Sequence, residues 1–329
     1  MGISGNVLVM ADFPGADFRF SFNILDLGSR EEFAETCRQG ERYGYDTIFA
    51  ADHLGSVAPF TTLVAAADAT ERIKVGTLVL NAAFWNPALL AREVITTDLL
   101  TGGRLELGLG AGHMKWEFAE AGLAWEPFAE RADRLEATIR ELGRLFAADG
   151  YPQQAAMREA MGLRVARPVQ RRGFDGAGPP LIVGGTGDRI LRIAAEHADI
   201  VAVAGAYQVK GQPPGTFRIG TAEEAAERVR YARECAGERA DQVEWHVLVQ
   251  LVLETGDRRA AAEKVLEQYG RMMTVEELLD TPFVLIGTVE QMAEQIVRNR
   301  ERFGFTYYTV HGPYMNGFAP VIERVRQVT

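Results

Sequence analysis

The feature that most constrains the fold is a regular alternation between short apolar segments, rich in β-branched residues, and longer segments with helical periodicity. This alternation is typical of parallel βα units. We expect eight strands, at residues 18–24, 46–51, 73–80, 104–110, 180–185, 199–205, 243–254 and 306–312. The helical segments include residues 30–44, 86–103, 127–146, 187–197, 221–237, 257–270 and 288–304, several of which begin at Asn, Asp or Thr and end at Gly, as helix ends prefer.

Eight such units in series predict the α/β class and a (β/α)8 TIM barrel with insertions, because right-handed βα crossovers accumulate around a closing parallel sheet. An open doubly wound sheet is the alternative. With 329 residues, 47% of them hydrophobic, the chain could bury one core or two, but it contains no interdomain linker or repeat. We therefore expect a single domain over residues 1–329. Three longer segments, 148–179, 205–220 and 270–287, interrupt the alternation and are expected to be lids or binding loops.

Composition and charge argue against several classes of partner. The formal charge of -10 repels phosphate backbones, so we expect no nucleic acid partner. No apolar run approaches the roughly 18 residues of a membrane span, so we expect no membrane association. The first residues lack the basic start of a signal peptide, and the two cysteines, Cys37 and Cys235, lie on expected helices; both observations favour a reducing, cytoplasmic location.

An acid and an imidazole follow the second expected strand, at Asp52 and His53. In a barrel the carboxyl ends of the strands face the active site, so this placement is typical of a functional pair. An imidazole titrates near neutral pH and a neighbouring carboxylate can set its tautomer, which would make His53 a general base or proton donor. Alternatively, Asp52 caps a short helix and His53 only packs against its neighbours.

Two glycine-rich turns follow the fourth and fifth strands, GLGAGH at 108–113 and VGGTGDR at 183–189. Glycine permits close backbone approach, and the free amides at a helix start attract phosphate. Neither turn has the spacing of a Rossmann or P-loop motif. Each alone could be an ordinary tight turn, but two on one rim favour a phosphorylated cofactor.

The remaining chemical groups give weaker signals. His113, His197, His246 and His311 lack metal-ligand spacing, so we expect no metal site, and His197 is expected to satisfy carbonyl groups at a helix end. No G-x-S-x-G motif is present, and neither cysteine follows a strand as a nucleophile would. The aromatic residues Trp85, Trp116, Trp125 and Tyr207 fall in expected loops, where they could form walls for a planar ligand or simply pack.

Three stretches together resemble the luciferase-like monooxygenase superfamily, and within it the coenzyme F420-dependent oxidoreductases most of all. They are FAADHLG, the long block that includes NPALLAREVITTDLLTGGRLELGLGAG, and PPLIVGGTGDRILRIAAEHADIVAV. The resemblance extends from about residue 18 to the end of the chain and is weakest across 148–179. The block from Val75 to Gly112 is its most specific part because it is long and ordered.

The resemblance implies a barrel of the bacterial luciferase type that holds coenzyme F420, or alternatively FMN, at its carboxyl rim. It implies that His53 handles a proton and that Asp52 orients it, and it places a non-prolyl cis peptide at Leu78-Val79 behind the ring. The implied cofactor contacts are Leu78, Val79, Asn81, Gly110, Ala111, Gly112 and, for the phosphate, the amides of Gly184, Gly185, Thr186 and Gly187. Trp85, His113 and Tyr207, which follow strands or lie in rim loops, are the expected substrate contacts.

The leading hypothesis is hydride transfer between reduced coenzyme F420 and a small organic substrate. The alternatives are an FMN-dependent monooxygenase that uses oxygen and reduced FMN from a partner reductase, a non-catalytic flavin-binding barrel, and a scaffold without ligand. Sugar-phosphate dehydrogenases of this superfamily carry a glutamate where this chain has His113, which argues against a sugar phosphate. The insertion at 148–179 is expected to be a lid over the substrate, and the resemblance implies a homodimer.

Overall fold

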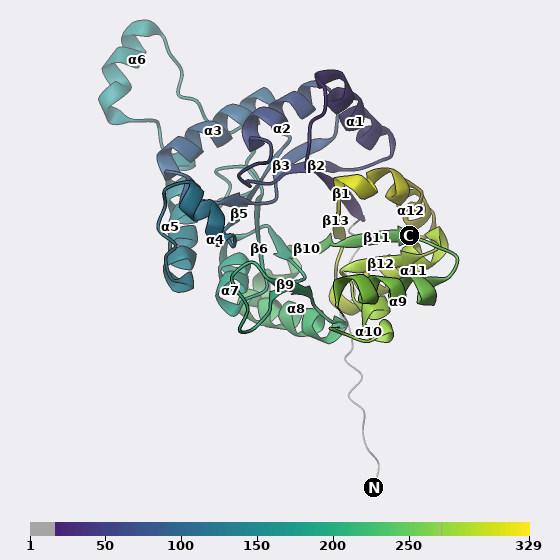
Figure 1. Ribbon diagram of the computed structural model, residues 1–329. Coiled ribbons are helices and arrows are strands. Elements are labelled where there is room, and N and C mark those ends of the chain that lie inside the picture. Colours follow the sequence, from purple (N-terminus) through teal and green to yellow (C-terminus); the bar gives the residue numbers. More distant parts are fainter. Residues whose placement is uncertain (1–16, 271) are drawn as a thin grey trace.

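A computed structural model describes residues 17–329 except residue 271, and within them eight parallel strands close into a barrel (Figure 1). β1 pairs with both β2 and β13, and β3 pairs with β5, so the sheet has no free edge among these strands. The barrel strands are β1 (Arg19–Ile24), β2 (Thr47–Ala50), β3 (Lys74–Thr77), β5 (Leu105–Gly110), β6 (Leu181–Gly185), β7 (Ile200–Val203), β10 (Glu244–Val249) and β13 (Tyr307–His311). The predicted TIM barrel is confirmed, and the open sheet is wrong.

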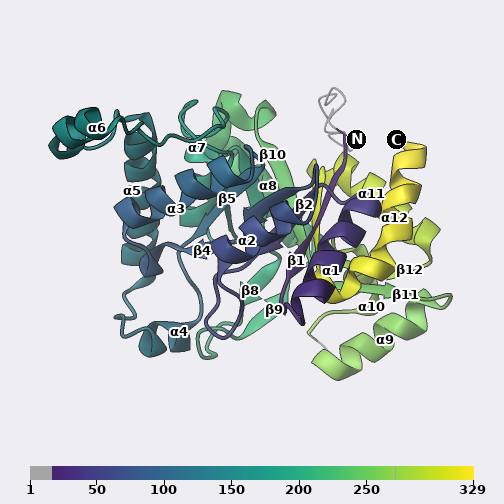
Figure 2. The same cartoon turned by 90° about the horizontal axis from the view of Figure 1, so that it is seen from above.

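Helices cover the outside of the barrel (Figures 1 and 2). They bury apolar stripes against the strands, and several begin with a Ser or Thr N-cap and a Glu or Gln three residues later. The covering helices are α1 (Arg30–Arg42), α2 (Pro59–Asp68), α3 (Pro87–Leu100), α5 (Phe128–Ala147), α7 (Asp188–His197), α8 (Ala222–Ala236), α11 (Val289–Phe303) and α12 (Met315–Val328). No helix in the described part of the chain is long and apolar enough to cross a membrane.

The third strand is interrupted where a continuous strand was expected. β3 ends at Thr77, the Leu78-Val79 peptide is cis, and β4 (Leu80–Asn81) continues along β5. The predicted non-prolyl cis peptide is therefore present. Two glycines of β5 make room for this irregular segment, because a Cβ on Gly108 would overlap the carbonyl group of Thr77 and one on Gly110 would lie 2.7 Å from Val79 Cγ2.

A charged network fills the barrel interior near the amino ends of the strands. The carboxylate of Glu106 is fully buried and accepts hydrogen bonds from Lys74 Nζ and Tyr307 Oη, each at 2.9 Å, and from Arg19. Burial alone would raise the pKa of Glu106, but the nearby Arg19 and Lys74 outweigh it and lower the pKa to about 2. The barrel is thus closed at this end by paired charges.

The seventh unit differs from the sequence prediction. The expected strand 243–254 leaves the barrel at Gln250, and its second half, β11 (Leu251–Glu254), pairs with β12 (Val284–Gly287) in a separate parallel sheet. The segment 270–287, expected to be a loop, contains α10 (Val275–Asp280) and β12. Four buried residues are too short an apolar run for the sequence to distinguish a strand from a loop.

The insertion at 148–179 does not cover the carboxyl rim of its own barrel, so the predicted lid is wrong. It connects α5 to the start of β6 and therefore lies at the amino ends of the strands, where α6 (Ala155–Met161) projects from the body (Figures 1 and 2). The segment 205–220 does lie at the carboxyl ends, as an antiparallel hairpin of β8 (Ala206–Gln208) and β9 (Phe217–Ile219).

We predict that Glu106→Gln destabilises the fold by about 3 kcal/mol at pH 7, because Arg19 and Lys74 lose their buried counter-charge. The pKa of Glu106 is depressed in the folded state, so its contribution is complete above the usual value of 4.5 and is lost as pH falls toward about 2. Urea unfolding should show the two proteins converging over that range. Glu290→Gln, which breaks a surface pair with Arg324, should leave stability unchanged; an equal effect of both variants would contradict the prediction.

Candidate functional site

The candidate residues gather at the carboxyl ends of neighbouring strands. Asp52 and His53 follow β2, Asn81 ends β4, and the turn from Gly110 to His113 follows β5. The glycines at 184–187 end β6 and lead into α7. The β8–β9 hairpin links these turns, since Thr186 Oγ1 donates to the Ala206 carbonyl oxygen at 3.5 Å and the Phe217 ring lies 5.6 Å from the ring of His113.

His53 is paired with a carboxylate that sequence reasoning missed. Its Nδ1 lies 2.8 Å from Oε1 of Glu117, which also accepts the Leu54 amide at 3.2 Å. Glu117 is buried in the short helix α4 (Lys115–Glu120). A carboxylate only accepts hydrogen bonds, so Nδ1 carries the proton and Nε2 is left to exchange one. No local pattern marks Glu117, because an acid in the first turn of a helix is ordinary.

Asp52 does not orient His53, contrary to expectation. Its Oδ2 accepts the indole N–H of Trp85 at 2.8 Å and the backbone amide of Asn81 at 3.2 Å. Burial raises the pKa of Asp52, and the Trp85 hydrogen bond opposes that rise. Asp52 therefore fastens the turn after β4 to the end of β2. The Trp85 ring stands edge-on to Phe60 at 5.4 Å, and its role as a substrate contact stays a prediction.

Asn81 offers an unused donor at the centre of the rim. Its Oδ1 accepts the Ala83 amide at 3.1 Å, but its buried Nδ2 has no partner among the described residues. Gly112 lies directly against this amide with φ of 74°, and a Cβ there would approach Oδ1 to 2.6 Å. An acceptor atom on a planar ligand would satisfy Nδ2, which is what the polar edge of a flavin or deazaflavin supplies.

Arg131 of α5 supports the turn after β5, and sequence reasoning also missed it. Its guanidinium donates to the carbonyl oxygens of Ala111, at 3.4 Å, and Gly112. It lies 3.7 Å from the centre of the Trp125 ring, so this ring packs on a buried cation. Only the fold brings α5 against this turn, which is why spacing along the chain gives no signal.

The turn between β6 and α7 fits a phosphate. Gly187 is the N-cap of α7 and supplies no side-chain oxygen, so the amides of the first helical turn have no side-chain cap. The positive end of the helix dipole favours an anion at this position. Arg228 of α8 lies beside the turn and donates to the Thr186 carbonyl oxygen at 3.4 Å, while Asp188 and Glu227 already pair with its charge.

Two of the expected substrate contacts, His113 and Tyr207, lie next to other side chains of the protein. The His113 ring lies 5.3 Å from the His53 ring and next to Phe217, so it borders the rim. Tyr207 lies beside Gly220, and its ring is 5.2 Å from the Arg218 guanidinium. Burial and the nearby Glu224 raise the pKa of Tyr207 to about 12. Substrate contact by either residue stays a prediction.

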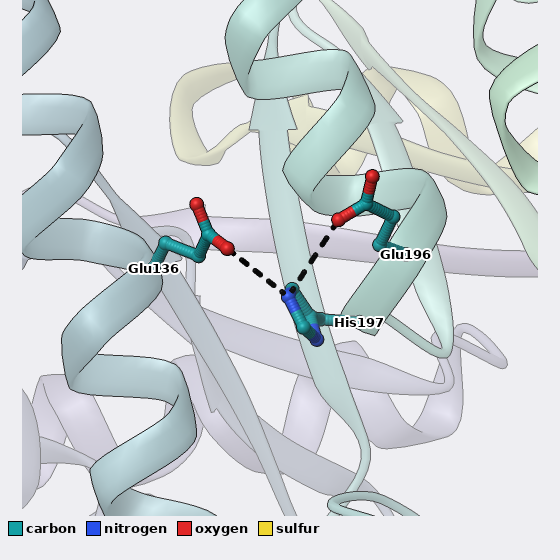
Figure 3. A group of neighbouring side chains, drawn as sticks. All are labelled: Glu136, Glu196 and His197. Atoms are coloured by element: carbon teal, nitrogen blue, oxygen red, sulfur yellow. Dashed lines mark ion pairs between the residues drawn. The ribbon is translucent and has the colours of Figure 1, made fainter.

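His197 belongs to a group of potential metal ligands at the opposite end of the barrel (Figure 3). It is the last residue of α7, and its Nε2 lies 3.9 Å from Glu136 and 4.0 Å from Glu196. Arg140 and Arg189 also contact Glu136, so cations of the protein already balance its charge. We therefore interpret the group as an ion-pair cluster between α5 and α7.

Comparison with known proteins agrees with this geometry. The family model described as luciferase-like monooxygenase matches residues 19–307. The F420-dependent glucose-6-phosphate dehydrogenase of Kribbella flavida is 26% identical over 303 residues, which cover 86% of this chain and 88% of that protein. The enzyme of the same name from Amycolatopsis mediterranei matches locally, with 34% identity over 127 residues that cover 36% of this chain and 38% of the relative.

Solved structures show the same fold at low sequence identity. The coenzyme F420-dependent tetrahydromethanopterin reductase of Methanopyrus kandleri superposes with a TM-score of 0.69 at 17% identity, over 95% of this chain and 99% of that one. The family match covers both glycine turns, the interrupted third strand and the His53 pair. The resemblance inferred from the sequence is thus confirmed, and this chain belongs to the luciferase-like monooxygenase family.

Proposed function

We propose that this protein is an oxidoreductase that uses coenzyme F420 to transfer hydride to or from a small organic substrate. The observation that carries the proposal is the meeting, at one rim, of the unpartnered amide of Asn81, the uncapped helix start at Gly187 and the paired imidazole of His53. Relatives named as F420-dependent enzymes support this choice of cofactor.

Each part of the rim has a separate task in binding. Asn81 Nδ2 would donate to the polar edge of the ring, behind which Leu78 and Val79 form the floor at the cis peptide. Gly112, whose missing Cβ makes room for the Asn81 amide, would border the chain of the cofactor, and the amides from Gly184 to Gly187 and the start of α7 would hold its phosphate. When bound, the cofactor supplies a hydride position at C5 of its deazaflavin ring.

His53 would handle the proton that accompanies hydride transfer. Glu117 holds Nδ1 protonated and directs the ring, so Nε2 takes up or releases the proton. Because the β8–β9 hairpin contacts both sides of the rim, it would limit the access of water to this proton.

The assembly and location belong to the same proposal. Exposed leucines on α3, with Leu89 at its start and Leu99 and Leu100 at its end, support a homodimer, since exposed apolar side chains favour burial against a partner. Cys37 and Cys235 are free thiols, which supports a reducing cytoplasm. A separate reductase would supply reduced cofactor when the enzyme reduces its substrate.

The cofactor assignment is tested by titrating the purified protein with coenzyme F420 and with FMN while following fluorescence. We expect F420 to bind at least about 10-fold more tightly than FMN. Tight binding of FMN alone would overturn the assignment in favour of a flavin monooxygenase.

The variant Gly187→Asp separates phosphate binding from folding in the same titration. Gly187 has φ of -83° and ψ of 146°, which any residue adopts, and a Cβ there would meet only Phe128 at 3.9 Å. Aspartate should cap the helix without loss of stability, yet its charge should weaken cofactor binding about 10-fold or more. Gly187→Asn is the neutral control and should weaken binding less. Unchanged affinity in Gly187→Asp would place the phosphate elsewhere.

We predict that Glu117→Ala changes the tautomer of His53 without preventing cofactor binding. Nitrogen-15 NMR of labelled histidine should show Nδ1 protonated in the wild type and a shift toward protonated Nε2 in the variant. F420 turnover with an alcohol or ketone that serves as substrate should fall about 10- to 100-fold. Glu120→Ala, an exposed acid of the same helix, is the matched control. Wild-type turnover in Glu117→Ala would show that the pair has no proton role.

A further inference from the structure

A cavity of about 330 Å³ lies next to the candidate site, on the side of β10 and β13. It is surrounded by the β8–β9 hairpin, the start of β11, α9 (Arg258–Tyr269), α10, and the residues Gly270, Met272 and Met273. Its lining is mostly apolar and includes Ile219, Leu251, Leu266, Met272, Met273 and Leu278. Four of these side chains come from the two segments, 205–220 and 270–287, that interrupt the regular alternation of the sequence, while Leu251 belongs to β11 and Leu266 to α9.

The cavity shares a wall with the rim. Phe217 lines it and also places its ring 5.6 Å from His113, whose ring is 5.3 Å from His53. Gln250, at the point where the chain leaves the barrel, lines the cavity and contacts His311 of β13 at 3.4 Å. The rings of Phe217 and His113 therefore separate the cavity from the proposed proton-handling residue.

The described residues that line the cavity offer no unpaired cation to a phosphate. Arg218 is the one cation among the lining residues that the structure describes, and both of its terminal nitrogens donate to Glu224, at 2.8 and 2.5 Å. The amide of Gln250 already donates to the Ala204 carbonyl oxygen at 3.2 Å. A dianionic group would lose its hydration here without gaining an unpaired cation from these residues, which is unfavourable.

We propose that this cavity binds the apolar part of an uncharged organic substrate. The assignment of this ligand as the substrate rests on the proposed function. A volume of about 330 Å³ is at the small end of ligand pockets and suits a compact molecule. The flexible thioethers of Met272 and Met273 let the wall adapt to different shapes.

The test uses prodan, a neutral naphthalene ketone whose fluorescence increases in an apolar site. We expect saturable binding to the wild type and at least about 10-fold weaker binding to Met272→Asp, because a carboxylate would then stand at the cavity wall. Met272 is 57% exposed, so its replacement leaves the core intact. Met161→Asp is the matched control, at a methionine that is 65% exposed on α6 at the other end of the barrel, and it should bind prodan like the wild type. Met273→Asp, at a half-buried position of the same wall, is a second variant and should also weaken binding.

Glucose 6-phosphate and coenzyme F420 complete the experiment. Glucose 6-phosphate should not displace prodan, and all variants should retain F420 affinity. Absence of prodan binding, equal binding to Met272→Asp and the wild type, or displacement by glucose 6-phosphate would each overturn the cavity assignment. Failure of the wild type to bind F420 would instead overturn the proposed function, so the two failures are distinguishable.

Discussion

The pairing of β1 with both β2 and β13 is the constraint on which the rest of this molecule depends, because it closes the parallel sheet into a barrel. Parallel strands end on the same side, so closure brings turns that are distant in the sequence to one rim. The interior is divided accordingly. Paired charges around Glu106 fill the amino end, while Phe49, Ile182 and the partly buried Leu78 fill the space below the rim.

The turns of the rim are stabilised in the same way: a charged side chain from one element forms hydrogen bonds with the backbone or a side chain in the turn of another element. These supports use buried or partly buried charges, whose hydrogen bonds are strong because water does not compete for them. The supports are Asp52 for the amide of Asn81, Glu117 for His53 and Leu54, Arg131 for Ala111 and Gly112, and Arg228 for Thr186. The groups that remain available to a ligand are accordingly the backbone at the glycines, the free amides and one edge of the His53 imidazole.

Features that depend on local sequence patterns could be predicted from the sequence. Period and turn chemistry predicted the barrel, and strand ends predicted the placement of His53 and the glycine turns; the cis peptide at Leu78-Val79 came from family resemblance alone. The supports could not be predicted, because Glu117 and Arg131 look like ordinary helix residues until tertiary packing places them. Residues 148–179 join a helix to the next strand, and in a βα barrel such connections lie at the amino ends of the strands. The predicted lid role rested instead on the length of this segment, which does not indicate the end of the barrel at which it lies.

Hydrogen–deuterium exchange with and without coenzyme F420 tests whether the sequence-distant turns form one cofactor cradle. We expect slower exchange on cofactor binding in residues 78–83, 110–117 and 184–190 together, because amides held by one ligand are exposed to solvent less often. We expect unchanged exchange in residues 155–168 of the projecting insertion. Protection confined to one of the three turns, or located in the insertion, would contradict the shared cradle.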